Sequence, residues 1–154
     1  MNVNIALNLK KDIKNWLEKM DFFLLHDPEV QEQDEENRYL VRAFVDEPRT
    51  LIGERGSNLK DFQTVFRLAM LKKYGPEIRI DLDINGYKKK REELLRRFAL
   101  SARNKALKEQ KPVELEPMNA FDRRAVHAAL TDYNDVKTES KGNYPDRRVV
   151  VYLA

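Results

Sequence analysis

Two segments of the chain alternate between apolar and polar residues, which is the pattern of a half-buried β-strand. The first covers residues 38–46 and the second covers residues 77–84. Their apolar positions are Tyr39, Val41, Ala43 and Val45 in the first segment, and Ile78, Ile80, Leu82 and Ile84 in the second. Pro48 follows the first segment and Asn85-Gly86 follows the second, so each ends near residues that turn the chain. The pattern predicts two strands that bury these apolar side chains.

Four other segments space their apolar residues three or four positions apart, as one face of a helix requires. They cover residues 7–20, 57–73, 87–110 and 120–131. The apolar positions are Leu7, Leu9, Ile13, Trp16, Leu17 and Met20 in the first segment, Leu59, Phe62, Phe66 and Met70 in the second, and Leu94, Leu95, Phe98, Ala99, Ala102 and Ala106 in the third. Asn119 precedes the fourth segment and can cap it, with Asp122 at the third helical position.

Shorter elements account for the rest of the chain. Residues 22–30 are extended in character and include a short apolar run, Phe22 to Leu25, that stops near Pro28. Residues 31–37 are polar and acidic, as expected of an exposed hairpin loop. Residues 113–116 and 147–153 have strand character, and residues 132–146 are loop-like apart from an extended piece at 136–139. This mixture of helices and strands predicts the α+β class.

The composition excludes several classes of protein. The chain of 154 residues has no cysteine, which rules out a disulfide scaffold, a thiolate zinc site and a cysteine nucleophile. Its two histidines, His26 and His127, are far apart in sequence, so we expect no histidine-rich metal site. No apolar run approaches the ~18 residues of a membrane span, and no signal-peptide pattern is present. We therefore expect a cytoplasmic protein with no metal, cofactor or catalytic residues and no insertion into a membrane.

Charge is distributed unevenly along the chain. The net charge is only +3, but residues 1–50 carry 7 basic and 11 acidic side chains, and residues 86–111 carry 10 basic and 3 acidic ones. The basic side chains of the second segment are Lys88, Lys89, Lys90, Arg91, Arg96, Arg97, Arg103, Lys105, Lys108 and Lys111. Most of them belong on the solvated face of a helix. As a group they also form a positive strip along which a phosphate backbone can run.

The segment Gly53-Glu54-Arg55-Gly56 follows Leu51-Ile52 and precedes the predicted helix over 57–73. The two glycines let the backbone turn tightly and approach a ligand closely, and the helix that follows offers N–H groups to an anion. Together with Ile52, Leu59 and Phe62, the segment resembles the core of a KH domain, and the order of elements, αββααβ, resembles its type II variant. The resemblance implies a surface for single-stranded nucleic acid that includes Gly53, Arg55, Gly56, Ser57 and Lys60.

Glu54 departs from the KH pattern, because it places a negative charge where a phosphate would lie. Either Glu54 points away and pairs with Arg55 or Lys60, or the loop binds phosphate weakly. The sequence leaves both interpretations open.

A second group of candidate residues lies in the last predicted helix. Arg123 and His127 are four positions apart and therefore project from one helix face. Arg123 supplies a guanidinium fork for phosphate, and His127 can donate a hydrogen bond or stack on a base. This Arg-x-x-x-His pair, followed by VKTES and GNYPDRRVVVYL, resembles the R-three-H domain of the bacterial Jag family, also called KhpB.

The resemblance to the Jag family adds residues that flank the binding surface. Glu139, Arg147 and Arg148 match such positions, and Arg124 is a further candidate. Because neighbouring residues of a strand point to opposite faces, only one of Arg147 and Arg148 can join that surface.

The resemblance covers nearly the whole chain and implies two domains. A KH type II-like domain spans residues 1–85, and an R-three-H domain spans residues 86–154 and includes the long basic helix over 87–110. The family implies a bacterial protein that binds single-stranded RNA, or single-stranded DNA, in post-transcriptional control linked to cell elongation or the envelope. It also implies a small partner protein made of a KH domain alone. Family members usually carry an additional N-terminal Jag module, which we expect this chain to lack.

Two other classes of function remain open. In the first, the protein is a scaffold whose KH surface binds another protein instead of RNA. In the second, it is a nuclease or phosphodiesterase that uses His127 as a base, with Asp122 or Glu139 as the acid. No paired-carboxylate or nucleophile motif supports the second class.

Overall fold

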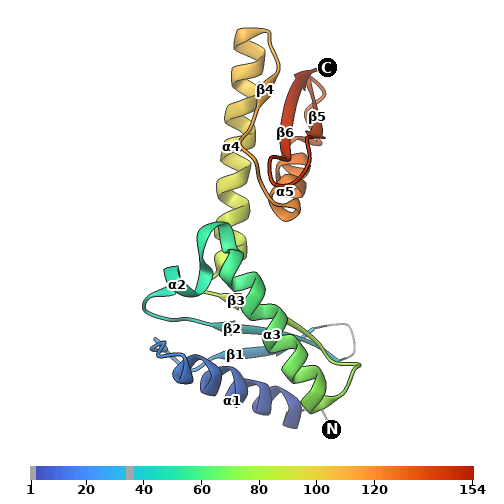
Figure 1. Cartoon of the computed structure of the whole chain (residues 1–154). Helices are drawn as coiled ribbons and strands as arrows, with labels where there is room; N and C mark the ends of the chain where they lie inside the picture. Colours follow the sequence, from blue (N-terminus) through green and yellow to red (C-terminus); the bar gives the residue numbers. More distant parts are fainter. Residues whose placement is uncertain (1–2, 34–36) are drawn as a thin grey trace. The chain divides into compact units, whose positions relative to one another are not determined.

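A computed structural model describes residues 3–33 and 37–154 of the chain. The chain divides into two compact units, Met1–Tyr87 (unit 1) and Lys88–Ala154 (unit 2), and each is described by itself. Both units combine helices with a small sheet, so the predicted α+β class is confirmed (Figure 1). None of the helices in the described part of the chain has the length and apolar character that a membrane span needs.

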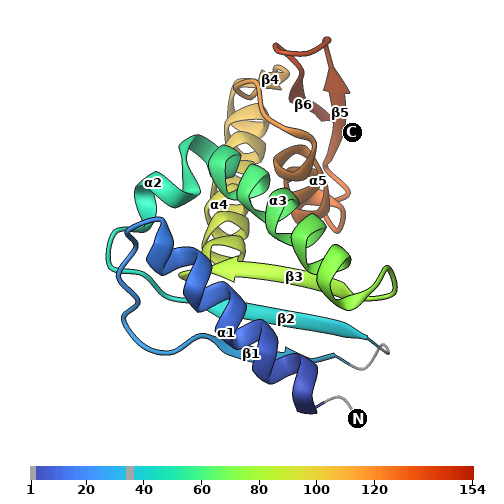
Figure 2. The same cartoon turned by 60° about the horizontal axis from the view of Figure 1, so that its bottom comes forward.

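Unit 1 has the order of elements that the sequence predicts. It consists of α1 (Val3–Lys19), β1 (Glu29–Glu32), β2 (Arg38–Ala43), α2 (Pro48–Ile52), α3 (Ser57–Tyr74) and β3 (Arg79–Ile84), with a 3-10 turn, η1 (Glu54–Gly56), before α3. The sheet has the order β1-β2-β3, with β1 antiparallel and β3 parallel to β2. The helices α1 and α3 cover one face of this sheet (Figure 2).

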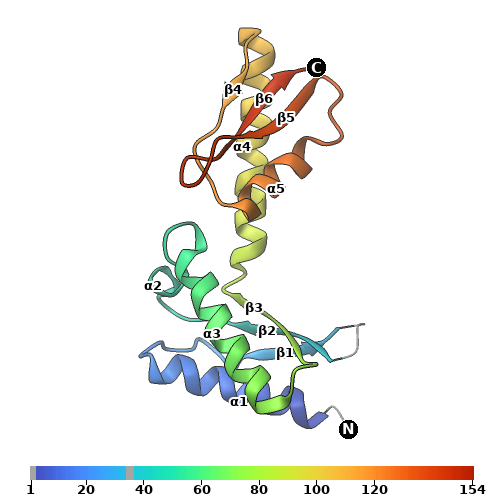
Figure 3. The ribbon, with the colours of Figure 1, turned by 45° about the vertical axis from the view of Figure 1, so that its right-hand side comes forward.

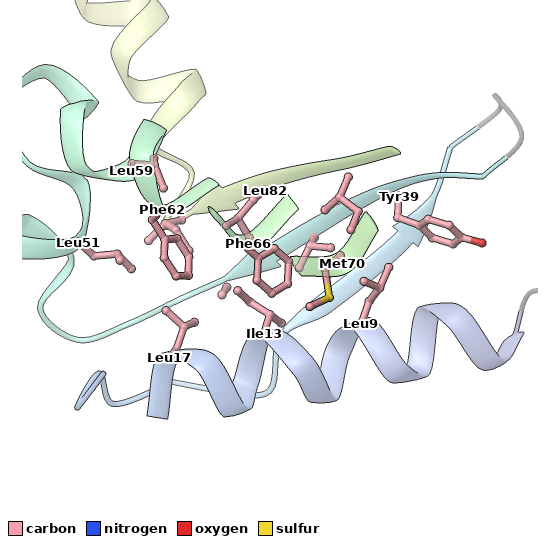
Figure 4. Packing of buried hydrophobic residues seen from close by; sticks show 14 of the residues in the cluster. Leu9, Ile13, Leu17, Tyr39, Leu51, Leu59, Phe62, Phe66, Met70 and Leu82 are labelled. Carbon is pink, nitrogen blue, oxygen red and sulfur yellow. The ribbon is translucent and has the colours of Figure 1, made fainter. Parts of the chain in front are cut away.

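The core of unit 1 lies between this face and the two helices. The predicted apolar positions of β2, α3 and β3 are all buried, and Leu9, Ile13 and Leu17 of α1 meet them from the other side (Figure 4). The Trp16 ring packs edge-on against Phe66, with 5.4 Å between the ring centroids. The alternation along β2 and β3 therefore predicted the buried face correctly.

Unit 2 forms a second core between two helices and a sheet. Its elements are α4 (Tyr87–Glu109), whose first residue ends unit 1, β4 (Val113–Glu114), α5 (Ala120–Leu130), β5 (Val136–Lys141) and β6 (Arg148–Leu153). The strands form an antiparallel sheet in the order β4-β6-β5 (Figure 3). Ala99 and Ala106 of α4, Val126 of α5, and Val149 and Val151 of β6 are fully buried.

The structure confirms four of the six predicted apolar positions of the long helix and corrects the other two. Leu94 and Phe98 were expected in the apolar stripe, but their side chains are 40% and 53% exposed. The core stripe consists of Leu95, Ala99, Ala102 and Ala106, which lie about one residue further round the helix.

Several boundaries also differ from the prediction. The helix α1 begins at Val3 and ends at Lys19, and both Leu7 and Met20 are exposed rather than buried. Residues 31 and 32, expected in a hairpin loop, belong to β1, where they pair with β2; residues 34–36 of that loop lie outside the described residues. The strand β5 continues to Lys141 because it stays paired with β6 beyond the expected end at residue 139. In contrast, β4 ends at Glu114, two residues short of the predicted end.

Candidate nucleic-acid interface

The first turn of α5 fixes the direction of the candidate residues in unit 2. The side-chain oxygen of Asn119 accepts a hydrogen bond from the backbone N–H of Asp122 at 2.9 Å, as predicted for an N-cap. The helix then continues to Leu130, which places Arg123 and His127 one turn apart. The two side chains interact electrostatically: the positive charge of Arg123 helps to lower the pKa of His127.

His127 lies between α5 and β5. Its Nδ1 is 2.7 Å from Thr138 Oγ1, and its Nε2 is 2.9 Å from Ser140 Oγ. Burial is the larger cause of the lowered pKa and Arg123 is the second, so the imidazole is neutral at pH 7. A neutral imidazole has one donor and one acceptor nitrogen, and both are engaged by hydroxyl groups here. His127 therefore positions β5 against α5.

Arg123 connects the same helix face to the start of β6. One terminal nitrogen of its guanidinium donates to the carbonyl oxygen of Met118 at 2.7 Å. The backbone N–H of Met118 in turn donates to the carbonyl oxygen of Arg147 at 3.0 Å. The structure thus brings Arg123, His127 and the backbone of Arg147 together at one end of the sheet.

Arg148 lies on the opposite face of that sheet. In the β5–β6 register Ser140 is opposite Val149 and Lys141 is opposite Arg148, and directly opposite residues share a face. His127 contacts Ser140, so Arg148 shares the other face with Lys141. Its side chain lies 3.4 Å from the carboxylate of Glu114. Of the two arginines, Arg147 is the one at the Arg123–His127 end.

The remaining predicted residues of unit 2 lie on exposed surface. Arg124 is exposed, and its Nε donates to the carbonyl of Ala120 in the previous turn at 3.2 Å. Glu139 points away from His127, since it lies between Thr138 and Ser140 on β5, and it is 3.6 Å from Lys141.

Two arginines of the basic segment, residues 86–111, form ion pairs inside unit 2. Arg91 reaches the fully buried carboxylate of Asp122 with Nη2–Oδ2 2.5 Å, and Arg103 reaches Asp135 with Nε–Oδ1 2.8 Å. The expectation that Arg91 and Arg103 decorate a solvated or phosphate-binding face is therefore corrected. Seven other basic side chains of the segment are exposed: Lys89, Lys90, Arg96, Arg97, Lys105, Lys108 and Lys111.

The loop Gly53–Gly56 of unit 1 has a backbone that requires its glycines. Gly53 and Gly56 have φ of 72° and 82°, and Arg55 between them has φ of 52°. A Cβ on Gly53 would lie 2.5 Å from Cγ of Asn58, whose amide donates to the carbonyl of Thr50 at 2.9 Å. A Cβ on Gly56 would lie 2.8 Å from the ring of Tyr87. The loop is built without space for side chains at either glycine.

The polar side chains of this loop face solvent. Glu54, Arg55, Ser57 and Lys60 are all exposed, so the loop presents one negative and two positive side chains to any ligand. Among the described residues of the whole chain, no group of three or more His, Asp or Glu side chains could hold a metal ion.

Sequence reasoning missed two residues of the candidate site in unit 2. Thr138 and Ser140 occupy both nitrogens of His127, whereas only Glu139 between them was singled out. Their spacing of two positions on a predicted strand was the available signal, because it places both hydroxyls on one face.

A comparison with known protein families matches the part of the chain that contains this site. Residues 93–153 match the R-three-H domain family, and this range contains Arg123, His127 and all three strands of unit 2. The chain therefore contains an R-three-H domain.

The relatives extend the similarity into unit 1. Over 127 residues the chain is 35% identical to RNA-binding protein KhpB of Clostridium symbiosum, covering 82% of this chain and 57% of the relative. It is 32% identical to RNA-binding protein KhpB of Bacillus subtilis over 127 residues, covering 81% of this chain and 60% of that protein. The chain is thus similar to KhpB proteins over most of its own length, in line with the resemblance seen in the sequence, and it spans about three fifths of the length of these two relatives.

Proposed function

We propose that the protein binds single-stranded RNA and that Arg123 is the central contact residue of unit 2. The observation that carries the proposal is the arrangement of α5 in a matched R-three-H domain, with Arg123 beside an imidazole that holds β5 in place. A guanidinium fixed on a rigid helix suits a phosphate, because its planar fork is organised before the ligand arrives. The names of the relatives, which are RNA-binding proteins, support the same ligand.

The proposed activity is binding without catalysis. A nuclease would need a carboxylic acid near His127, but Asp122 is buried in its ion pair with Arg91, and Glu139 points to the other face of the sheet. Both nitrogens of His127 are also engaged by hydroxyls, which leaves no simple path for a proton to a substrate. These contacts favour the RNA-binding interpretation over the nuclease.

The test of the unit 2 site is the affinity for a fluorescently labelled 12-nucleotide single-stranded RNA. Arg123→Ala should weaken binding about tenfold, the loss expected for one charge-assisted contact. Lys11→Ala is the matched control, because Lys11 is an exposed cation of α1, outside residues 86–111 and outside the Gly53–Gly56 loop. Far-UV circular dichroism must show that both variants are folded. Equal effects of the two substitutions would remove Arg123 from the site.

For unit 1 we propose a KH type II-like domain over about residues 1–85, followed by the R-three-H domain over 86–154. Support comes from the αββααβ order, the β1-β2-β3 sheet and the positive φ of Gly53 and Gly56. Its loop would contact phosphates through Arg55, Ser57 and Lys60. The long helix α4 would connect the two domains.

Substitutions at the exposed middle positions of the loop test this role, since neither glycine tolerates a side chain. Arg55→Glu should weaken RNA binding and Glu54→Gln should strengthen it, because both changes act on the charge that meets phosphate. If both variants bind as the unchanged protein does, the loop does not contact RNA, and the scaffold interpretation of unit 1 gains support.

The biological context follows from the family and is part of the proposal. The protein would act in post-transcriptional control linked to cell elongation or the envelope, in the bacterial cytoplasm, and with a small KH-only protein as partner. Crosslinking followed by RNA sequencing in the native cell identifies the bound transcripts, and a pull-down after nuclease treatment identifies the protein partner.

A further inference from the structure

Tyr144 presents an aromatic ring almost completely to solvent. It lies in the loop over residues 142–147, which joins β5 to β6, and the residue is 95% exposed. Tyr133 and Tyr152, the other tyrosines of unit 2, each have a cation over the ring, at 4.3 Å and 4.9 Å from the ring centroids. The ring of Tyr144 therefore contributes little to the core of unit 2, and its apolar faces lie in water.

The loop that carries Tyr144 is a narrow turn. Gly142, its first residue, has φ of 84°, and a Cβ on Gly142 would lie 3.4 Å from the carbonyl oxygen of Asp146 and 3.6 Å from Cα of Arg147. The two ends of the loop therefore lie against each other, and residues 143–145 form its tip. A short loop whose ends are in contact holds Tyr144 close to the ends of the two strands.

Hydrogen bonds join the base of this loop to Arg123. The carbonyl oxygen of Arg147 accepts a hydrogen bond from Met118 N–H at 3.0 Å, and the carbonyl oxygen of Met118 accepts one from Arg123 at 2.7 Å. Figure 3 shows the loop between β5 and β6 at the same end of unit 2 as the start of α5. Because Tyr144 is separated from Arg147 by only two residues, their Cα atoms are at most roughly 10 Å apart. An exposed aromatic ring thus lies within a short stretch of nucleic acid from the proposed phosphate contact.

We propose that Tyr144 stacks on an unpaired base of the same strand whose phosphate contacts Arg123. A nucleic-acid strand alternates phosphates with flat bases, and a guanidinium near an exposed ring complements both groups. Stacking uses the face of the ring, which every base can meet, so the contact depends little on the identity of the base. Bases inside a duplex are already stacked and paired, so the contact favours single strands. The inference rests on the proposed function, because it requires a bound strand.

The test measures the affinity of three variants for the labelled 12-nucleotide single-stranded RNA. Tyr144→Ala should weaken binding at least about fivefold, the lower end for one base stacked on an aromatic ring. Tyr144→Phe keeps the faces of the ring and should bind as the unchanged protein does. Phe23→Ala is the matched control, because Phe23 is 75% exposed but belongs to unit 1, and its loss should leave the affinity unchanged. A blunt-ended RNA duplex should bind the unchanged protein and Tyr144→Ala equally, since its bases are paired.

Each alternative result has a distinct meaning. If the unchanged protein does not bind the single-stranded RNA, the proposed function itself fails. If Arg123→Ala weakens binding but Tyr144→Ala does not, this inference alone is overturned. It is also overturned if Tyr144→Phe loses as much affinity as Tyr144→Ala, because the hydroxyl rather than the ring would then make the contact, or if Tyr144→Ala weakens duplex binding equally. Should Tyr144→Ala not fold, the ring-proton resonances of Tyr144 in the unchanged protein are followed by NMR; stacking must shift them upfield when the RNA is added, and unshifted resonances contradict it.

Discussion

The imidazole of His127 lies between the hydroxyl groups of Thr138 and Ser140, 2.7 Å and 2.9 Å from its two ring nitrogens. One hydroxyl must donate to the imidazole and the other must accept from it, as long as the ring is neutral. The residue was a candidate RNA contact on the basis of sequence spacing. Its contacts instead join α5 to β5, so a substitution at His127 acts on the fold of unit 2 before it acts on any ligand.

Protonation of His127 should therefore destabilise unit 2. Its folded-state pKa lies below the ordinary value of 6.5, through burial and then through Arg123, so the unfolded chain binds the proton more readily. The stabilising contribution is fully present above about pH 6.5 and is lost as the pH falls through that value toward the folded-state pKa. The free energy of unfolding should decrease between pH 7.5 and pH 5.5, as measured by urea denaturation with far-UV circular dichroism.

The variant His127→Gln separates this effect from general acid denaturation. It should remove most of the pH dependence in that range, in which carboxylates remain ionised. His26→Gln changes the other histidine, which belongs to unit 1, and serves as the control. A pH dependence that survives in His127→Gln contradicts the assignment.

At the scale of elements, the buried faces of β2 and β3 were predictable. A period of two leaves no freedom: once Tyr39 is buried, Val41 and Ala43 must be buried as well. The buried face of a helix is less strictly determined by the sequence, because several adjacent rows of apolar residues fit a period of 3.6. In α4, both Leu94–Phe98 and Leu95–Ala99 are such rows, and only close packing against α5 and the sheet selects the second.

Neighbouring leucines of α4 provide a matched test of that selection. Leu95 is 2% exposed and Leu94 is 40% exposed. Leu95→Ala should reduce the free energy of unfolding by about 2–4 kcal/mol through lost burial and the cavity left behind. Leu94→Ala should cost less than about 1 kcal/mol, because its side chain is already partly exposed in the folded state and leaves no closed cavity when it is shortened. Urea denaturation of the two variants decides between the rows, and equal losses would contradict the packing described.

The candidate sites show the same limit of sequence reasoning. Arg123 and His127 could be placed on one face because both lie on one helix, and the Gly53–Gly56 loop because its residues are contiguous. Thr138 and Ser140 act across elements, from β5 toward α5. The local pattern of a strand or helix does not indicate which element packs against it. These residues could therefore be identified only from the three-dimensional structure.

For the whole molecule, the uneven charge determines how binding should respond to salt. If five exposed cations of residues 86–111 each neutralise one phosphate, the slope of log affinity against log salt concentration is about −3.5. Replacing Lys89, Lys90 and Arg97 by Ala should reduce the slope to about −1.4, since these three are exposed rather than paired in the core. Titration of a labelled RNA at several KCl concentrations measures both slopes. An unchanged slope would show that this strip does not contact the phosphate backbone.

The contact between Gly56 and Tyr87 bears on what a sequence motif can prove. Tyr87 occupies the space where any side chain at position 56 would lie, and the backbone there has φ of 82°. Folding of unit 1 alone thus favours a glycine at this position. A descendant of this protein that no longer bound nucleic acid would still have a folding reason to keep it, so a motif of this kind can persist after its ligand is lost. Glu54 and Arg55 are exposed, and folding does not constrain them in this way. A change of ligand would therefore first alter the residues at these two positions.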